Sequence, residues 1–403
     1  MLSVDEQMRI ITSGAAQIVP EADLRKKLEK GEPLNIKLGV DPTSPDLHLG
    51  HAVPLRKMRQ FQDLGHKVTL IIGNGTALIG DPSGRNSTRP QLSREQIKVN
   101  AETYVNQAFK ILDPEKTTLR YNSEWILSLN MEELLKLMAQ FTVARILERD
   151  DFHNRYTSNL PISLHEFMYP VMQAYDSVVI KADVELGGTD QLFNLLAGRE
   201  LMEKLGMEPQ VCLTLPLLEG TDGVKKMSKS YGNYIGLTDE PSDMFGKVMS
   251  IPDELMVKYY RLASTESVSA IDEIEAGLAN DELHPNKVKR ALARNIVAAY
   301  YDEEQANAAE EQFDLVFKKH DVPDDIAEYT SDLTPNEEGL VYLAKIIHDA
   351  GLAQSVGEAR RLIDGGGVKL NGDAVAPRVY NVEPEKLKDC VLQVGKRKFI
   401  KLV

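Results

Sequence analysis

Short apolar runs alternate with amphipathic stretches through the first 235 residues, and this alternation limits the chain to a small group of folds. Residues 68–72 are apolar except for Thr69, as in a parallel strand covered on both faces. Residues 36–40 predict a second strand, and residues 52–64 predict a helix closed by Gly65. Further strands are predicted at 178–180 and 211–217. The pattern indicates an α/β fold with a Rossmann-like parallel sheet.

Capping boxes predict three further helix starts. Ser93, Asn130 and Ser163 are each followed three residues later by Gln or Glu, which can bond back to the helix N-terminus. Pro170 should kink the helix that follows Ser163, because proline has no N–H to donate.

The strand pattern stops after Gly236. Helices are predicted at 244–250, 253–262, 268–278 and 286–317, and a polar stretch at 324–338 predicts a linker. Helices at 341–349 and 355–363 then precede two hairpin turns, at Asn371-Gly372 and Gly395-Lys396. We therefore predict an α/β domain over 1–235, an all-α domain over 236–323, the linker over 324–338 and a small α+β domain over 339–403.

Charge is distributed unevenly, although its sum is −14. Residues 341–403 hold 11 Lys and Arg against 7 Asp and Glu, a local charge of +4, which leaves −18 for the first 340 residues. A basic tail can neutralise nucleic-acid phosphates. No apolar run approaches the ~20 residues of a membrane span, and no secretion signal is visible, so a cytoplasmic protein without a membrane partner is expected. Cys212 and Cys390 lie in no metal-ligand motif, so no protein-held metal is predicted.

The segment His48-Leu49-Gly50-His51 lies at the predicted start of the helix after the first strand. Both imidazoles then fall within one turn of a helix N-terminus, where an anion is favoured. Gly50 lets a flat base approach the backbone, and the histidines can donate to phosphate oxygens. Asp41 and Thr43 precede this segment at the strand's carboxyl end, where ligands bind in open α/β sheets. Alone, such a short match can arise by chance, and Asp-Pro-Thr can be ordinary turn chemistry.

A second segment, Lys226-Met227-Ser228-Lys229-Ser230, carries two ammonium groups separated by small hydroxyl residues. This composition suits a polyphosphate on which charge is growing. A basic loop on its own is usually a solvated turn. In this order, on either side of alternating strands and helices, the two segments together outline an ATP site.

Tyr169, Gln173 and Asp176 are spaced i, i+4 and i+7, so a helix presents them on one face. A carboxylate for a hydroxyl, with an amide and a phenol for an amino group, fits an amino-acid substrate. The alternative is a solvated helix face, which the apolar neighbours of these residues disfavour.

Two further clusters are weaker. In Gly187-Gly188-Thr189-Asp190-Gln191 the glycines allow close backbone approach and Asp190 could bind ribose hydroxyls, but the sequence is also that of an ordinary turn. Asp81 could hold a substrate ammonium while Arg85 and Arg89 reach phosphate, or the arginines could be surface charges.

The order of these segments resembles the signature of class I aminoacyl-tRNA synthetases, and over essentially the whole chain it resembles the bacterial tyrosyl-tRNA synthetases. The end of the chain is similar to the RNA-binding domain of a small-subunit ribosomal protein. The resemblance implies tyrosine contacts at Thr76, Asp81, Asn122, Tyr169, Gln173, Asp176 and Gln191. It implies ATP contacts at Asp41, Thr43, His48, Gly50, His51, Gly188, Asp190, Lys226, Met227, Ser228, Lys229 and Ser230. It implies catalytic roles for His48, His51, Lys226, Lys229, Arg85 and Arg89 around the phosphates.

By the same resemblance, the chain would convert tyrosine and ATP to tyrosyl-adenylate and pyrophosphate, and then transfer tyrosine to the 3′ end of tRNA(Tyr). Mg²⁺ would accompany ATP, bound largely through phosphates and water. Residues 236–323 would bind the anticodon, and the chain would form a homodimer with no DNA partner.

Lys37 departs from the family pattern, because the better-known branch has a tyrosine there that contacts the substrate hydroxyl. Three rivals remain: a tryptophanyl-tRNA synthetase, a non-catalytic RNA-binding relative and a small-molecule adenylating ligase. Asp176 with Gln173 favours tyrosine over an indole, the two intact phosphate-binding segments favour catalysis, and the basic tail disfavours the ligase.

Overall fold

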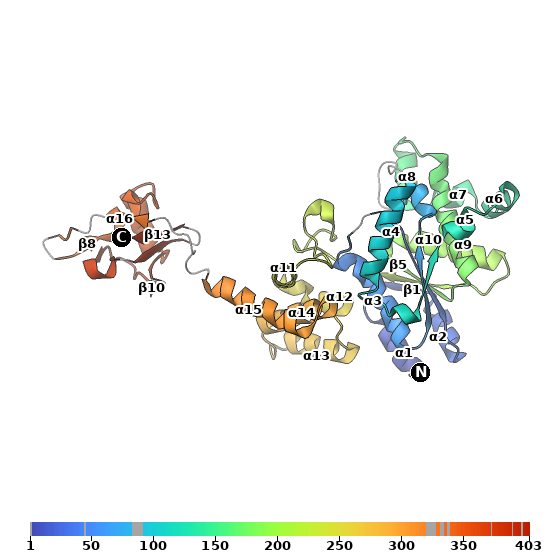
Figure 1. Ribbon diagram of the computed structural model, residues 1–403, viewed down its shortest axis with the longest axis horizontal. Helices are drawn as coiled ribbons and strands as arrows, with labels where there is room; N and C mark the ends of the chain where they lie inside the picture. Colours follow the sequence, from blue (N-terminus) through green and yellow to red (C-terminus); the bar gives the residue numbers. More distant parts are fainter. Residues whose placement is uncertain are drawn as a thin grey trace. The chain divides into compact units, whose positions relative to one another are not determined.

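The computed structural model describes residues 2–43, 46–82, 92–319, 328–330, 334–336, 339–371, 373–388, 390–395 and 398–403. Contacts divide the chain into two compact units, Met1–Glu310 and Glu311–Val403 (Figure 1). The boundary predicted between residues 235 and 236 lies inside the first unit. The four-part division therefore stays a prediction.

The first unit is built on a six-stranded sheet with strand order β1-β6-β5-β2-β3-β4. The strands are β1 (Gln17–Val19), β2 (Asn35–Val40), β3 (Lys67–Ile72), β4 (Thr117–Tyr121), β5 (Val184–Gly188) and β6 (Val211–Leu215). β1 pairs antiparallel with β6, and all other neighbours pair parallel. Every residue of β6 is buried, as expected when both faces of a sheet are covered. The predicted Rossmann-like sheet is confirmed.

Helices cover both faces of this sheet. They are α1 (Val4–Thr12), α2 (Glu21–Glu29), α3 (Leu49–Asp63), α4 (Arg94–Ala108), α5 (Ser123–Ile126), α6 (Met131–Met138), α7 (Val143–Ile146), α8 (Asp150–Thr157), α9 (Met168–Ile180) and α10 (Leu192–Lys204). Figure 1 shows α3 and α4 on the side of the sheet opposite α9 and α10. Right-handed crossovers require this, because the chain runs one way across the sheet through β2, β3 and β4 and the other way through β5 and β6. The reversal places a ligand crevice at the carboxyl ends of the neighbouring strands β2 and β5.

Two details of the α/β region were predicted wrongly. Residues 178–180 are not a strand but the last turn of α9. Pro170 does not kink a helix, because a 3₁₀ turn (Leu164–Phe167) precedes α9 and leaves Pro170 in the first turn of α9, where a missing N–H costs little. The capping boxes at Ser93, Asn130 and Ser163 are confirmed.

From residue 241 on, the first unit is helical. The helices of this part are α11 (Pro241–Met249), α12 (Met256–Ala263), α13 (Val268–Ala279), α14 (Pro285–Tyr300) and α15 (Glu303–Lys319), of which the last continues into the second unit. The single helix predicted at 286–317 is two helices. Tyr301 leaves the helical backbone conformation, and the Asp302 carboxylate accepts the N–H of Gln305 (2.8 Å), which starts a new helix.

The second unit packs two helices against short strands. Its elements are β7 (Glu328–Tyr329), β8 (Val341–Tyr342), α16 (Leu343–Asp349), α17 (Val356–Asp364), β9 (Val368–Leu370), β10 (Asp373–Ala374), β11 (Asn381–Val382), β12 (Val391–Val394) and β13 (Lys398–Leu402). Both predicted hairpins are confirmed by the antiparallel pairs β9 with β10 and β12 with β13, although Gly372, Lys396 and Arg397 lie outside the described residues. Ala359, Leu387 and Leu402 are among the residues of its own core, so this is the predicted small α+β domain.

Each unit holds one buried cysteine. Cys212 lies in β6 and Cys390 directly precedes β12. Within the ranges described, no helix is long and apolar enough to cross a membrane.

Candidate active site

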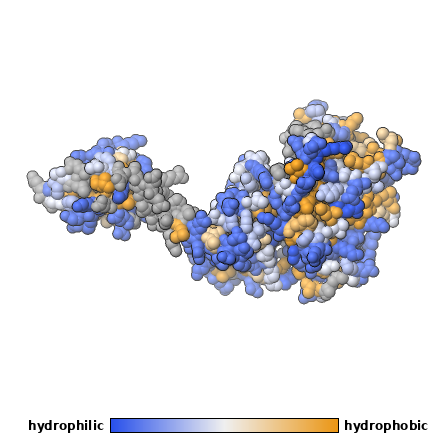
Figure 2. Space-filling view, in the orientation of Figure 1, coloured by the Kyte–Doolittle hydropathy of each residue, from blue (hydrophilic) through white to orange (hydrophobic). Residues whose placement is uncertain are grey.

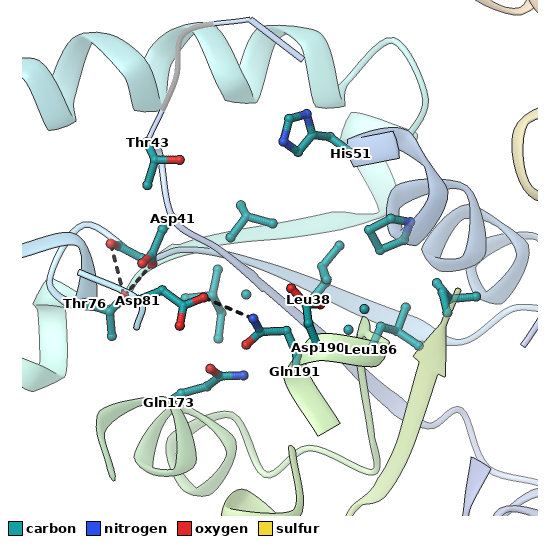
Figure 3. Close-up of a pocket in the computed structure, with 18 of the residues that line it drawn as sticks. Leu38, Asp41, Thr43, His51, Thr76, Asp81, Gln173, Leu186, Asp190 and Gln191 are labelled. Carbon is teal, nitrogen blue, oxygen red and sulfur yellow. Dashed lines mark hydrogen bonds between the residues drawn. The ribbon is translucent and has the colours of Figure 1, made fainter. Parts of the chain in front are cut away.

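A cavity of about 330 Å³ opens at the carboxyl ends of the parallel strands (Figure 3). Its walls come from the segments after β2, β3, β4, β5 and β6, from the first turns of α3 and from one side of α9. Most of the predicted site residues line it: Asp41, Thr43, Gly50, His51, Thr76, Asp81, Asn122, Tyr169, Gln173, Asp176, Gly188, Asp190 and Gln191. Segments that are far apart in sequence are thus brought to one cavity.

Tyr169, Gln173 and Asp176 all line the cavity from α9, so the predicted polar helix face is confirmed. Asp176 is buried, and its carboxylate accepts the indole N–H of Trp125 (2.8 Å) and the amide N–H of Asn122 (3.3 Å). Burial raises the pKa of Asp176 to about 6, and the charge of Lys37 and these hydrogen bonds oppose the rise. The carboxylate is therefore ionised at neutral pH and able to accept a hydrogen bond from a hydroxyl.

Asp41 forms hydrogen bonds to side chains from two other walls of the cavity. One carboxylate oxygen accepts the phenolic O–H of Tyr169 (3.0 Å) and the other accepts the hydroxyl of Thr76 (2.7 Å). A side chain at Gly73 would collide with this group, because its Cβ would lie 2.0 Å from the Asp41 carboxylate. Burial and the charge of Asp41 raise the pKa of Tyr169, which keeps its phenol protonated.

Asp81 has partners that the sequence did not reveal. Its carboxylate accepts from Gln191 Nε2 (3.1 Å) and from Arg149 Nη2 (3.2 Å), and Arg149 also donates to Asn194 (3.0 Å). Figure 3 shows the Asp81–Gln191 contact. Arg149 is buried and precedes α8, so it is a fixed cation beside the pocket.

Asp190 faces the cavity after β5, where Gly188 has no side chain. A Cβ at Gly188 would lie 2.5 Å from the Asp190 carboxylate. Burial and the charge of Asp81 raise the pKa of Asp190, while Lys226 opposes the rise. The action of Lys226 on Asp190 connects the basic loop to the cavity.

The two histidines stack at the N-terminus of α3, with ring centroids 3.8 Å apart. The backbone N–H of His48 donates to Nδ1 of His51 (3.3 Å), so His51 carries its proton on Nε2. Burial, the neighbouring ring and Lys229 lower the pKa of His48 to about 3. His51 lines the cavity, and desolvation together with the charge of Lys229 lowers its pKa as well. Both rings are neutral at pH 7 and can donate one hydrogen bond each.

The basic loop lies against this helix start. Backbone bonds join Leu49 to Ile235 (2.9 Å) and Leu237 to Leu47 (3.0 Å), which bring the segment after β6 beside the histidines. The amine of Lys229 forms an ion pair with Asp46 (2.7 Å). Within the described part of the chain, His48 and residues 226–230 stand outside the cavity lining but next to it.

Arg85 and Arg89 lie outside the described residues. Trp125, Arg149 and Pro54 were not predicted as parts of the site. The first two act through partners 51 and 68 positions away in sequence, a separation that no local pattern reveals. Pro54 could have been found from the sequence. A proline within a predicted helix has no N–H, so the carbonyl four residues earlier loses its helical hydrogen bond.

Comparison with known protein families gives two matches. Residues 29–318 match the family model for tRNA synthetases class I (W and Y). Residues 343–379 match the model for the S4 domain. The first match covers most of the first unit and the start of the second, and the second match lies within the second unit.

Curated relatives extend over the whole chain. The tyrosine–tRNA ligase of Moorella thermoacetica is 53% identical over 99% of this chain and 96% of its own length. Those of Oleidesulfovibrio alaskensis and Aquifex aeolicus are 50% and 49% identical, with complete coverage of both chains in each case.

Solved structures are similar in fold. A C-terminally truncated mitochondrial tyrosyl-tRNA synthetase of Aspergillus nidulans has a TM-score of 0.65 at 22% identity, covering 79% of this chain and 95% of that one. The tyrosyl-tRNA synthetase of Archaeoglobus fulgidus, complexed with L-tyrosine, has a TM-score of 0.62 at 24% identity, covering 76% and 99%.

Proposed function

Because this chain belongs to the class I tRNA synthetases (W and Y), and among them to the tyrosine–tRNA ligases, we propose that the cavity binds tyrosine and ATP side by side. The chain is an aminoacyl-tRNA ligase that joins tyrosine to tRNA and uses ATP to do so. Each part of that reaction can be assigned to residues of the cavity and its surroundings.

The observation that supports tyrosine recognition best is the buried Asp176 carboxylate. It is held by Trp125 and Asn122 and faces the cavity. A buried carboxylate needs donors, and the phenolic O–H of tyrosine supplies one that phenylalanine lacks. Such a site rejects the analogue without the hydroxyl strongly, and the handling of tyrosine against phenylalanine by this class of enzyme is the established example of that effect.

We assign the ammonium group of tyrosine to a second set of lining residues, apart from Asp176. Its ammonium has three donors, and the oxygens of Tyr169, Gln173 and Asp81 line the same cavity. Gln191 supports Asp81 directly, whereas Thr76 supports Tyr169 through their shared acceptor Asp41. Asn122 in turn donates to the Thr76 hydroxyl (3.1 Å). The ammonium is therefore bound by oriented acceptors of which one is charged.

ATP is assigned to the N-terminus of α3 and the segments around it. His51 and His48 donate to phosphate oxygens, Gly50 admits the base, and Asp190 beside Gly188 accepts from ribose hydroxyls. Asp41 and Thr43 complete this side. Lys226 and Lys229, with Met227, Ser228 and Ser230 shaping their loop, bind the pyrophosphate part, and we propose the same for Arg85 and Arg89. Mg²⁺ arrives on the ATP phosphates and offsets their charge.

The chemistry needs no nucleophilic side chain. An oxygen of the tyrosine carboxylate attacks the α-phosphorus, and the bond from that phosphorus to the bridging oxygen breaks, which releases pyrophosphate. A hydroxyl of the terminal tRNA ribose then attacks the tyrosyl carbonyl, loses its proton, and AMP leaves. The residues of the site contribute by holding the reactants together and by stabilising charge on the phosphates.

Pyrophosphate exchange into ATP tests this assignment. Exchange should depend on tyrosine and be at least ~10⁴-fold less efficient with phenylalanine, and tryptophan should not replace tyrosine. Efficient exchange with tryptophan would favour the tryptophan-specific branch of the same family. Absence of exchange together with tight tRNA binding would indicate a non-catalytic relative.

We also propose that the second unit binds tRNA(Tyr), that the helices between 236 and 323 contact its anticodon, and that the enzyme works in the cytoplasm. The S4 match and the cations of that unit support the RNA contact. Those placed by the structure are Lys345, Arg360, Arg361, Lys369, Arg378, Lys386, Lys388, Lys398 and Lys401.

We propose a homodimer from the exposed apolar residues of the chain segment that connects β4 to β5. Apolar side chains gather there on α5, α6, α7 and the 3₁₀ turn before α9, and Leu164 is 84% exposed. The others are Leu127, Met131, Leu135, Met138 and Val143. Apolar, orange side chains are visible along this edge in Figure 2. Exposed apolar patches of this kind mark interfaces.

Sedimentation of Leu164→Asp tests the dimer. This variant should be monomeric at concentrations where the parent is a dimer, whereas Leu283→Asp, which changes an exposed leucine in the helical region, should remain dimeric. A Leu164→Asp variant that sediments as the parent does would place the interface elsewhere.

A further inference from the structure

Lys37 is the most deeply buried cation beside the active site. It lies in β2, its side chain is 0% exposed, and within the described chain it is not part of the cavity lining. Its amine donates to the Glu185 carboxylate (2.8 Å), the Ser177 hydroxyl (2.7 Å) and the backbone carbonyl of Gln173 (3.0 Å). All three ammonium protons therefore have acceptors.

Glu185 in β5 is equally buried and extends this cluster. One of its oxygens also accepts from Nε2 of Gln173 (3.1 Å), and the other accepts from Ser177 (3.1 Å) and from Gln210. Gly198 on α10 leaves room for these groups, because a Cβ there would lie 2.7 Å from the Gln210 amide and 3.0 Å from the Ser177 hydroxyl. The cluster is a packed polar group between the sheet and α9.

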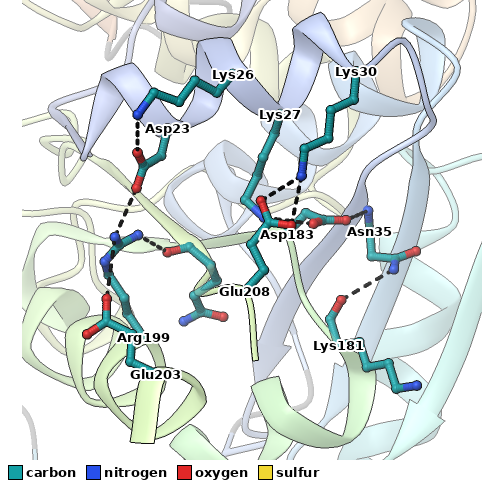
Figure 4. Close-up of polar contacts among 11 residues, drawn as sticks. Asp23, Lys26, Lys27, Lys30, Asn35, Lys181, Asp183, Arg199, Glu203 and Glu208 are labelled. Carbon is teal, nitrogen blue, oxygen red and sulfur yellow. Dashed lines mark hydrogen bonds and ion pairs between the residues drawn. The ribbon is translucent and has the colours of Figure 1, made fainter. Parts of the chain in front are cut away.

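Stability alone gives no reason for such a pair. Removing two charges from water costs more than their attraction returns in many proteins, and apolar replacements of similar volume are often neutral or stabilising. A second buried lysine gives the comparison. Lys27 on α2 pairs with Asp183 (2.9 Å) just before β5, at the other end of the sheet, and shares contacts there with the exposed Glu208 (Figure 4). That pair ties helix and sheet together far from the cavity, whereas the Lys37 pair borders it.

The Lys37 pair contacts Gln173 and Ser177, which flank Asp176 on α9. Glu185 can only accept, so it fixes the Gln173 amide with Nε2 toward the cluster and Oε1 at the other end of the amide. Lys37 holds the backbone carbonyl of the same residue.

The charge of the pair also acts on Asp176, one turn further along α9. The groups that act on the Asp176 carboxylate are the hydrogen-bond donors Trp125 from α5 and Asn122 after β4, and the charges of Lys37 from β2 and Glu185 from β5. Attraction by Lys37 exceeds repulsion by Glu185. Cys212 in β6 lies within reach of Glu185, and its pKa of about 12 keeps it neutral.

We propose that Lys37 and Glu185 are positioning residues for amino-acid selection: they orient the Gln173 amide and keep a positive charge beside Asp176, so that Asp176 stays the acceptor of the substrate hydroxyl. This proposal rests on the tyrosine site proposed above. It gives Lys37 a role behind the pocket wall rather than a direct contact with substrate.

Trp125 allows a direct test, because it is the only tryptophan and its N–H bonds to Asp176. Its emission in the substrate-free protein should change with pH as Asp176 titrates, near pH 6 in the parent. In Lys37→Met/Glu185→Gln, which removes both charges at nearly constant volume, the inflection should move to higher pH, because the attraction of Lys37 is lost together with the weaker repulsion of Glu185. Asp176→Asn should abolish it. An unchanged inflection in the double variant would overturn the proposal.

Selectivity provides the second readout. A shift of about one pH unit would lower the ionised fraction at pH 6 from about one half to about one tenth, so preference for tyrosine over phenylalanine in pyrophosphate exchange should then fall about fivefold there. Displacement of Gln173 would slow exchange with tyrosine and with phenylalanine alike. This effect therefore cancels in the ratio of the two rates. A ratio that stays at the parental value at pH 6 would also contradict the proposal.

Lys27→Met is the matched control, because it breaks a buried lysine–carboxylate pair of the same sheet away from the cavity. It should keep the parental inflection and ratio even if it lowers the melting temperature. A Lys27→Met variant that shifts both readouts would show that any buried charge change disturbs the pocket. If the parent shows no tyrosine-dependent exchange, the proposed function fails, whereas the emission test of Lys37 still stands.

Discussion

The two lysines of the basic loop, Lys226 and Lys229, act on different charged or titratable groups. Lys229 is paired with Asp46 and acts on both histidines, while Lys226 acts on Asp190. Neither lysine belongs to the wall around the amino-acid residues. We therefore expect their charges to act on the phosphates of ATP rather than on tyrosine.

Lys226→Ala and Lys229→Ala should each slow tyrosyl-adenylate formation by about 10²- to 10³-fold, the usual loss when one group that stabilises transition-state charge is removed. Tyrosine affinity should be nearly unchanged, because these groups meet charge that develops during the reaction. Single-turnover rates and equilibrium dialysis with tyrosine separate the two effects. Asp46→Asn, which frees Lys229, should react at close to the parental rate. An equal loss of tyrosine affinity in the lysine variants would contradict the assignment.

The histidine pair makes the fold sensitive to acid. Their folded pKa values are lowered, to about 3 for His48, whereas an unfolded histidine titrates near 6.5. Below pH 6.5 the unfolded chain therefore binds protons that the folded chain does not, and stability falls as pH drops toward 4. Each histidine contributes up to about 1.4 kcal/mol per pH unit, less for His51 because its ring meets water in the cavity.

Urea unfolding of the parent and of His48→Gln/His51→Gln between pH 4.5 and 7 measures this effect. The variant should lose less stability across that range. An identical pH dependence of stability in the two proteins would mean that the two rings titrate in the folded protein as they do in the unfolded chain.

The residue types of the site could be predicted from the sequence, but several of their partners could not. The helical spacing of Tyr169, Gln173 and Asp176 is a local property, so it was visible. The pairing of Asp81 with Arg149, and of Lys37 with Glu185, joins residues 68 and 148 positions apart. Only the folded sheet brings these charges together.

At the level of elements, helix α3 has a proline in its interior. Pro54 lies inside this helix, and it has no N–H to give to the carbonyl of Gly50 four residues earlier. Both residues line the cavity. We expect the Gly50 carbonyl to accept the amino group of adenine instead.

Pro54→Ala should restore the helical bond and stabilise the protein by up to ~3 kcal/mol, while raising the KM for ATP and leaving that for tyrosine unchanged. Thermal unfolding and initial rates in the exchange assay measure the two effects. Stabilisation without any change in the KM for ATP would show that the carbonyl does not bind ATP.

Element boundaries show where sequence patterns lose information. The capping boxes and the strands at 36–40, 68–72 and 211–217 were predicted within about two residues of the structure. Residues 178–180 were taken for a strand because three β-branched or apolar residues in a row have no helical period of their own. They continue a helix that packs against α10 and the sheet, and tertiary packing decides their conformation.

At the scale of the whole molecule, the proposed tyrosine and ATP site and the proposed tRNA-binding cations lie in different units. All described residues assigned to tyrosine and ATP lie in the first unit. A chain ending after Lys319 keeps α15 whole, and it should still exchange pyrophosphate at close to the parental rate. It should charge tRNA poorly, because it lacks the basic residues after Val341.

The salt dependence of tRNA binding gives the quantitative test. Its log–log slope should become shallower by about 0.7 to 0.9 for each tRNA phosphate that the truncated chain no longer neutralises. Binding and charging are compared for both chain lengths across a salt series. Undiminished charging with an unchanged slope would place the RNA surface on the first unit.

The two cysteine thiols also allow the local unfolding of each unit to be measured separately. Cys212 belongs to the first unit and Cys390 to the second, both are buried, and burial raises the pKa of each. An alkylating reagent can modify such a thiol only when its surroundings transiently unfold. Mass spectrometry of the two cysteine peptides over time would therefore yield two local opening free energies from one unmodified chain, without mutation and without an attached probe.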